Sequence, residues 1–186
     1  RFRVTFKGPG GHSFGSFGTV SAVHALGRAV ARIGEFQVPN APRTTFNVGR
    51  IGGGTSVNAI ASEAWMEVDL RSGDAPALRA LEKQFRQAVQ DAVTDENARW
   101  HSHALTVSIE TVGMRPAGRV PPTAPIVQAA ASVSKALNLP LSFAEGSTDA
   151  NLPLSLGIPA LTIDTGGRGQ GAHTENETFD ATDAWK

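Results

Sequence analysis

The sequence contains no cysteine. The chain therefore forms no disulfide and no thiolate metal site, and cysteine usage says nothing about its compartment. Its 17 basic and 17 acidic residues cancel, so no excess charge favours nucleic acid or an anionic membrane as a partner. No apolar run approaches a membrane-spanning length, and no signal peptide is visible. We expect a cytoplasmic protein with no nucleic acid and no membrane as partner.

The chain has enough apolar residues to bury a core. It is 186 residues long and 40% hydrophobic, which suits one large or two small domains. It begins in a strand pattern without an initiating methionine, so we expect a piece of a longer protein.

Residues 45–71 organise the chain. From 64 to 71, apolar and polar residues alternate, as in a strand with one buried face. A shorter strand buries Phe46 and Val48. The connection between them holds Gly52–Gly54 and then polar residues, including Asn58. Functional residues often sit on such loops. On these residues alone, a flexible connection that binds nothing is the favoured reading.

The first 113 residues follow a recognisable order of elements. Strand 2–7 precedes a helix over 19–33, strands 44–51 and 64–71, a helix that starts at Asp74, and strand 105–110. This β-α-β-β-α-β order predicts a ferredoxin-like domain over residues 1–113, with both helices on one apolar face. That topology leaves strand 44–51 at a sheet edge. We predict that a homodimer forms there by continuing the sheet.

Residues 114–186 read as α/β. They predict a linker, a helix over 123–137, short extended segments at 141–144 and 158–163, and a short helix that includes Leu154. The segment at 158–163 is apolar enough to be a buried strand. These elements are too few to close a sheet of their own. The predicted fold class is therefore α+β: a ferredoxin-like domain followed by an incomplete α/β portion.

Three clusters of polar residues could take part in catalysis or ligand binding, and each could also be an ordinary surface feature without a function. His12 lies in a glycine-rich turn, where a lone histidine is usually just solvated. Asn58 could donate to an oxyanion and Arg71 could clamp a carboxylate, although Arg71 could equally pair with a neighbouring acid. His173 could ligate zinc with Glu175 or Glu177 nearby, or simply lie in a surface turn.

The spacing of His101 and His103 would also allow both to ligate one metal ion. Without acidic residues nearby, this indication of a metal site is weak.

Four motifs in this order carry a resemblance: Gly10–Ser13, Thr44–Asn58, Gly146–Asn151, and His173-Thr174-x-x-Glu177. Together they resemble the zinc-dependent peptidase family that includes peptidase T, glutamate carboxypeptidase, aminoacylase and succinyl-diaminopimelate desuccinylase. The resemblance covers nearly the whole chain.

The resemblance implies a hydrolase of peptides or N-acyl amino acids with two zinc ions. Residues 1–113 look like its lid and dimerisation domain, and residues 114–186 like the C-terminal part of its catalytic domain. By resemblance, His173 is the last zinc ligand, and His12 reaches into the partner subunit's site to polarise the scissile carbonyl. Asn58 and Arg71 look like substrate contacts, and Asp149 falls in a motif that lines the site.

The other metal ligands and the general base of the family have no counterpart in these residues. The chain alone is therefore expected to be inactive. The alternative is a non-catalytic dimerisation or small-ligand-binding module on the same ferredoxin-like unit.

Overall fold

The computed structural model describes residues 1–164 and 166–185. It separates the chain into two compact units, residues 1–117 and 118–186. Each unit is described by itself below.

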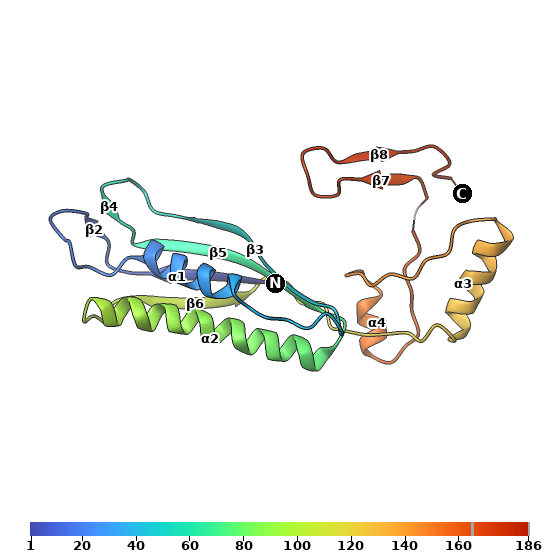
Figure 1. The fold of residues 1–186 in the computed structure, drawn as a ribbon, viewed down its shortest axis with the longest axis horizontal. Coiled ribbons are helices and arrows are strands. Elements are labelled where there is room, and N and C mark those ends of the chain that lie inside the picture. Colours follow the sequence, from blue (N-terminus) through green and yellow to red (C-terminus); the bar gives the residue numbers. More distant parts are fainter. Residues whose placement is uncertain (165, 186) are drawn as a thin grey trace. The chain divides into compact units, whose positions relative to one another are not determined.

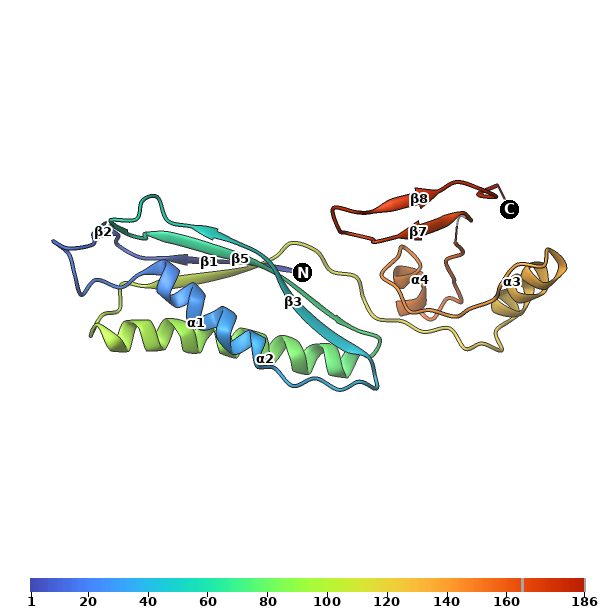
Figure 2. The same cartoon turned by 45° about the horizontal axis from the view of Figure 1, so that its top comes forward.

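The first unit is an antiparallel sheet covered by two helices (Figures 1 and 2). Its elements are β1 (Phe2–Lys7), β2 (Gly11–His12), α1 (Ala22–Gly34), β3 (Thr44–Gly53), β4 (Ala59–Ile60), β5 (Glu63–Ser72), α2 (Ala75–Arg99) and β6 (Thr106–Thr111). The four-stranded sheet has the order β3-β5-β1-β6, with β3 at an edge. The predicted order of elements, the α+β fold and the edge position of this strand are thus confirmed.

The core lies between the sheet and the helices, as the alternating pattern predicts. Phe2, Val4 and Phe6 of β1 are buried, and their intervening neighbours are not. The Phe2 ring meets the Phe85 ring of α2 at 5.2 Å between centroids. Three alanines on the buried face of α1 allow the backbone of that helix to lie close to its neighbours: Ala22, Ala25 and Ala29.

The two helices begin differently. The side chain of Asp74 accepts the backbone N–H of Ala77 at 2.9 Å, which confirms the predicted cap of α2. Helix α1 begins at Ala22, three residues later than predicted, and its N-cap Ser21 makes no side-chain cap. The backbone N–H of Thr19 instead donates to the carbonyl of Ser16 in a turn, so the residues before Ser21 belong to the preceding loop.

A β-bulge at Gly49 changes which face of the sheet the next residues occupy. Val48 pairs with Val68, but Arg50 pairs with Glu67. The extra residue turns Arg50 to the open face, where its guanidinium lies 3.0 Å from the Glu67 carboxylate. The alternation of the sequence does not reveal this shift.

The second unit contains short elements only. They are α3 (Pro125–Ala136), α4 (Asn151–Ser155) and a hairpin of β7 (Arg168–Gln170) with β8 (Thr178–Asp180). The hairpin was not predicted. Within α3 only Val127 is buried, and Ile126, Val133 and the C-cap residue Leu137 are exposed.

Two predicted strands of the second unit are wrong. Neither 141–144 nor 158–163 forms a strand, and Ile158 and Ile163 are 54% and 71% exposed. An apolar extended segment becomes a strand only when a neighbouring strand takes up its hydrogen bonds. Within residues 1–164 and 166–185, no strand pairs with either segment. None of the described helices is both long and apolar enough to cross a membrane.

Candidate functional site

A two-residue ladder between β2 and β4 brings His12 next to the connection that carries Asn58. His12 pairs with Ala59, and the N–H of Ser13 donates to the carbonyl of Asn58 at 2.9 Å. Between β1 and β2 the chain turns at Gly10, whose φ is +72°. A Cβ on this residue would lie 3.0 Å from the Ser62 side chain. Glycine at this position therefore lets the chain leave β1 and pair again with β4.

The imidazole of His12 is held by its own loop. Its Nδ1 accepts the backbone N–H groups of Phe14 and Gly15, each at 3.3 Å, and its carbonyl accepts the N–H of Ser16 at 2.8 Å. A nitrogen that accepts hydrogen bonds carries no proton, so in the neutral ring the proton lies on Nε2. The side chain is exposed, and Nε2–H is the group it offers to a ligand.

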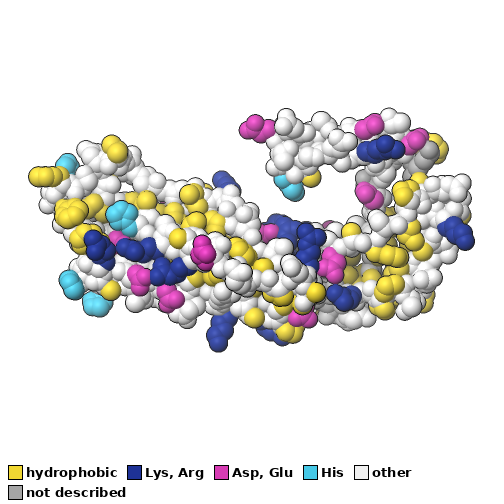
Figure 3. Space-filling view, viewed as in Figure 1, with side chains coloured by type: hydrophobic (Ala, Val, Ile, Leu, Met, Phe, Trp, Pro, Cys, Tyr) yellow, Lys and Arg dark blue, Asp and Glu magenta, His cyan; other side chains and the backbone are white. Residues whose placement is uncertain are grey.

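Asn58 offers a second donor. Its Oδ1 accepts a short hydrogen bond from the hydroxyl of Ser56, which leaves the amide nitrogen to donate. Phe14, two residues after His12, and Val57, directly before Asn58, are almost fully exposed. The space-filling view shows apolar and histidine side chains gathered at the end of the unit where β2 and β4 lie (Figure 3). The His12 Nε2–H and the Asn58 amide are each a neutral donor of the kind that binds a polarised carbonyl oxygen or an oxyanion.

Arg71 lies elsewhere in the first unit. It pairs with Thr45 near the far end of β5, about 26 Å along the strand from Glu63, at roughly 3.3 Å per residue. Its Nε donates to the Asp69 carboxylate. One copy of the chain therefore does not bring Arg71 together with Asn58. The partner of Arg71 is Asp69, a neighbouring acid, as the alternative without a binding role predicted.

The carboxylate of Asp69 is held ionised by its neighbours. Burial opposes ionisation, but hydrogen bonds from Arg71 and Arg1 outweigh it and lower the pKa of Asp69. A lowered pKa stabilises the folded state above the ordinary aspartate pKa of about 4, and this contribution disappears as the pH falls through the lowered value.

We expect Asp69→Asn to destabilise the first unit at pH 7 by less than about 1 kcal/mol, since the side chain is partly exposed. Urea unfolding of both proteins at pH 7 and pH 2.5 measures this. The difference should shrink at the lower pH, and a constant difference would show that the charge of Asp69 is not its cause.

In the second unit, His173 lies in the turn between β7 and β8. Its φ is +65°, its side chain is exposed, and its backbone N–H donates to the Glu177 carboxylate at 3.0 Å. Glu177 therefore holds the backbone of the turn rather than the imidazole. The segment 158–163, which precedes this hairpin and was predicted as a buried strand, is neither buried nor a strand.

The other sequence-predicted residues are placed as follows. Asp149 is exposed in the turn that leads into α4, where its carbonyl accepts the N–H of Leu152 at 3.3 Å. His101 and His103 are exposed in the link after α2. Across the described part of the chain, no group of three or more His, Cys, Asp or Glu residues could hold a metal ion.

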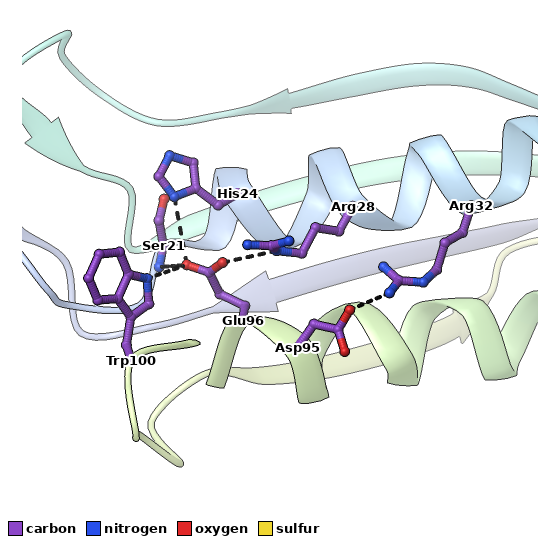
Figure 4. Close-up of polar contacts among 7 residues, drawn as sticks. All are labelled: Ser21, His24, Arg28, Arg32, Asp95, Glu96 and Trp100. Carbon is purple, nitrogen blue, oxygen red and sulfur yellow. Dashed lines mark hydrogen bonds and ion pairs between the residues drawn. The ribbon is translucent and has the colours of Figure 1, made fainter. Parts of the chain in front are cut away.

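Sequence reasoning missed a buried carboxylate. Glu96 of α2 is 0% exposed, and its oxygens accept from the Ser21 backbone at 3.1 Å, Arg28 at 3.2 Å and the Trp100 indole at 3.2 Å (Figure 4). It lies three and seven positions after Val93 and Val89, on the apolar stripe of α2. A charged residue on an apolar stripe was the available signal.

The sequence model of the M20 peptidase dimerisation domain matches residues 1–97, which is more than half of the 186-residue chain. This chain belongs to the M20 peptidase dimerisation domain family. The match begins with β1 and ends within α2. The dimerisation domain implies self-association within this family.

Solved structures show the same fold as this M20 chain. A tripeptidase from Staphylococcus aureus superposes with a TM-score of 0.71 at 21% identity, over 95% of this chain and 45% of that one. Aminopeptidase PepT from Bacillus cereus has a TM-score of 0.71 at 20% identity, over 98% and 47%. An aminobenzoyl-glutamate utilization protein from Klebsiella pneumoniae has a TM-score of 0.64 at 20% identity, over 81% and 38%.

Among curated proteins, the uncharacterised protein YqjE from Bacillus subtilis is 24% identical over 160 residues, which are 85% of this M20 chain and 40% of YqjE. The M20 chain thus spans less than half the length of these relatives.

Proposed function

We propose that this M20 chain is the dimerisation domain and the C-terminal part of the catalytic domain, residues 114–186, of a peptidase or amidohydrolase. The enzyme would cleave an amide bond in a peptide or an N-acyl amino acid. The family match supports the dimerisation role. The names of the tripeptidase and of aminopeptidase PepT support hydrolysis of peptides. The pair of donors on the β2–β4 ladder supports a direct part in the reaction.

His12 would donate its Nε2–H to the oxygen of the scissile carbonyl. The observation that carries this role is that Nδ1 already accepts two backbone N–H groups, so the ring is held with Nε2 as its donor. As negative charge develops on the carbonyl oxygen, this donor and the amide of Asn58 would stabilise it. Both residues lie at the end of the lid, and we propose that they act in the site of the partner subunit.

The homodimer would form through the edge strand β3, over residues 44–51. An edge strand presents unpaired backbone N–H and C=O groups, and a second copy can pair with them. Arg71 would contact a substrate carboxylate, and Asp149 would line the catalytic site. Because Arg71 lies far along β5 from Asn58, these two contacts would be made at different places on the lid.

The intact enzyme would use two zinc ions, and His173 is the ligand that this chain would contribute. The residues described here do not fit a zinc pair by themselves, because no group of three suitable ligands occurs among them. The chain by itself is expected to hydrolyse neither a tripeptide nor an N-acyl amino acid.

Hybrid dimers of the longer enzyme that carries this chain test the proposal. His12→Ala should lower kcat by about 100-fold or more, as for the loss of one oxyanion donor, and His173→Ala should abolish activity. Mixing the two variants should restore about a quarter of wild-type activity, since half of the dimers are hybrids and each hybrid has one complete site. The reporter is tripeptide hydrolysis after subunit exchange.

A mixture no more active than its two parents would overturn the in-trans role of His12. It would favour the second candidate, a dimerisation module with no part in catalysis. The family model supports that candidate, since it describes a dimerisation domain and matches the first unit only.

A further inference from the structure

The loop that carries His12 is attached to the first unit along two legs. The outgoing leg is hydrogen-bonded to the strand connection: Gly8 donates to Ser62 at 2.8 Å, β2 pairs with β4, and Ser13 donates to Asn58. The return leg, residues 16–20, bonds to its own loop, through Ser16 to His12 and through Thr19 to Ser16. The side chain of Trp100, just after α2, contacts the return leg.

Trp100, the residue after α2, is the contact for this leg. The Phe17 ring meets the Trp100 ring edge-on, with centroids 5.5 Å apart and an interplanar angle of 80°. Gly18, with φ +102°, lies beside the same indole, where a Cβ would be 3.8 Å from the ring. The two residues together place the leg over the end of α2.

Glu96 orients Trp100. Its Oε1 accepts both the indole N–H and the backbone N–H of Ser21, where the loop enters α1 (Figure 4). Its Oε2 accepts from Arg28, seven residues or about two turns further along α1. Because the Glu96 side chain is fully buried, one carboxylate joins the indole to the end of the loop without competition from water.

We propose that Trp100 and Glu96 are positioning residues for His12. By holding the return leg, they keep the N–H groups of Phe14 and Gly15 facing Nδ1 of the imidazole. Both of these hydrogen bonds are 3.3 Å long, near the upper limit, so a shift of about 0.5 Å in the leg breaks them. The ring then loses the contacts that keep its proton on Nε2. The importance of this positioning for catalysis rests on the proposed function. The orientation of the His12 imidazole by its loop does not depend on that function.

Nuclear magnetic resonance on the 186-residue chain tests the positioning without any substrate. Phe17→Ala is the main variant, because Phe17 is 80% exposed and the fold does not depend on it. At a pH where the imidazole is neutral, exchange of the Phe14 and Gly15 amide hydrogens should accelerate about tenfold. Nitrogen-15 spectra of His12 should show the Nδ1–H tautomer, whereas those of the wild type should show only the Nε2–H tautomer.

Trp100→Ala should give the same changes, and Trp100→Phe, which keeps a ring against Phe17 but loses the indole N–H to Glu96, should give smaller ones. Asp95→Ala is the matched control, since it removes the Arg32–Asp95 ion pair between the same two helices and leaves the indole in place. It should leave both amides and the His12 tautomer unchanged.

Unchanged exchange and tautomer in Phe17→Ala would overturn the proposal, as would equal changes in Asp95→Ala. These spectra report on the loop alone. If they change as expected while hybrid dimers show no rescue, the positioning stands and the proposed catalytic role fails.

Discussion

Replacement of Glu96 by alanine is expected to destabilise the first unit by about 2–4 kcal/mol, because the donors to a fully buried carboxylate lose their acceptor. The truncation removes the acceptor of three donors, which belong to Ser21, Arg28 and Trp100. The Ser21 N–H is at the N-terminus of α1, where a negative charge is also favourable. Buried donors without an acceptor keep their full cost of desolvation.

Urea unfolding followed by circular dichroism measures this effect. Glu96→Gln retains the shape and one acceptor oxygen, so we expect it to cost about half as much. Asp95→Ala removes an adjacent but exposed ion pair and should cost less than about 1 kcal/mol. If Glu96→Ala cost no more than Asp95→Ala, the buried carboxylate would not be the link between α1 and α2.

Replacement of Gly53 by alanine is expected to cost about 4 kcal/mol or more. Gly53 has φ +134°, and a Cβ there would lie 2.5 Å from Cα of Ala64 and 2.6 Å from the carbonyl oxygen of Glu63. Both atoms belong to the backbone of β5 and cannot move aside cheaply. Backbone strain and the clash each cost on the order of 1–3 kcal/mol. Because Gly53 starts the connection to Asn58, the same variant should displace that donor.

Gly27→Ala is the matched control. Gly27 is an exposed residue inside α1, and a Cβ there meets nothing within 4 Å. Alanine should stabilise the helix by up to about 1 kcal/mol. Urea midpoints of the two variants should therefore move in opposite directions. A Gly53→Ala protein within about 1 kcal/mol of the wild type would show that β3 and β5 can separate at this point.

The sheet could be predicted because its signal is local. In β5, Ala64, Met66, Val68 and Leu70 are buried and their neighbours are not, and this period of two is written in consecutive residues. The cap at Asp74 is equally local. The order of strands followed from the sequence of elements, because few arrangements connect them without crossing.

The candidate site was predicted only as separate residues. His12 and Asn58 are 46 positions apart, and only the two-residue ladder of β2 with β4 brings their backbones together. Two residues are too few for any periodic pattern. Arg71, by contrast, was already at the end of the predicted strand 64–71, and its pairing with Thr45 agrees with that place.

By itself the sequence determined the two helices and the four main strands of the first unit, the apolar face of the sheet and the edge position of β3. Only the tertiary structure decided the meeting of His12 with Asn58, the burial of Glu96 against α1 and the absence of a strand at 158–163 among the described residues. Periodic burial is a property of neighbouring residues in one segment. Hydrogen-bond partners that come from distant segments exist only once the segments have packed.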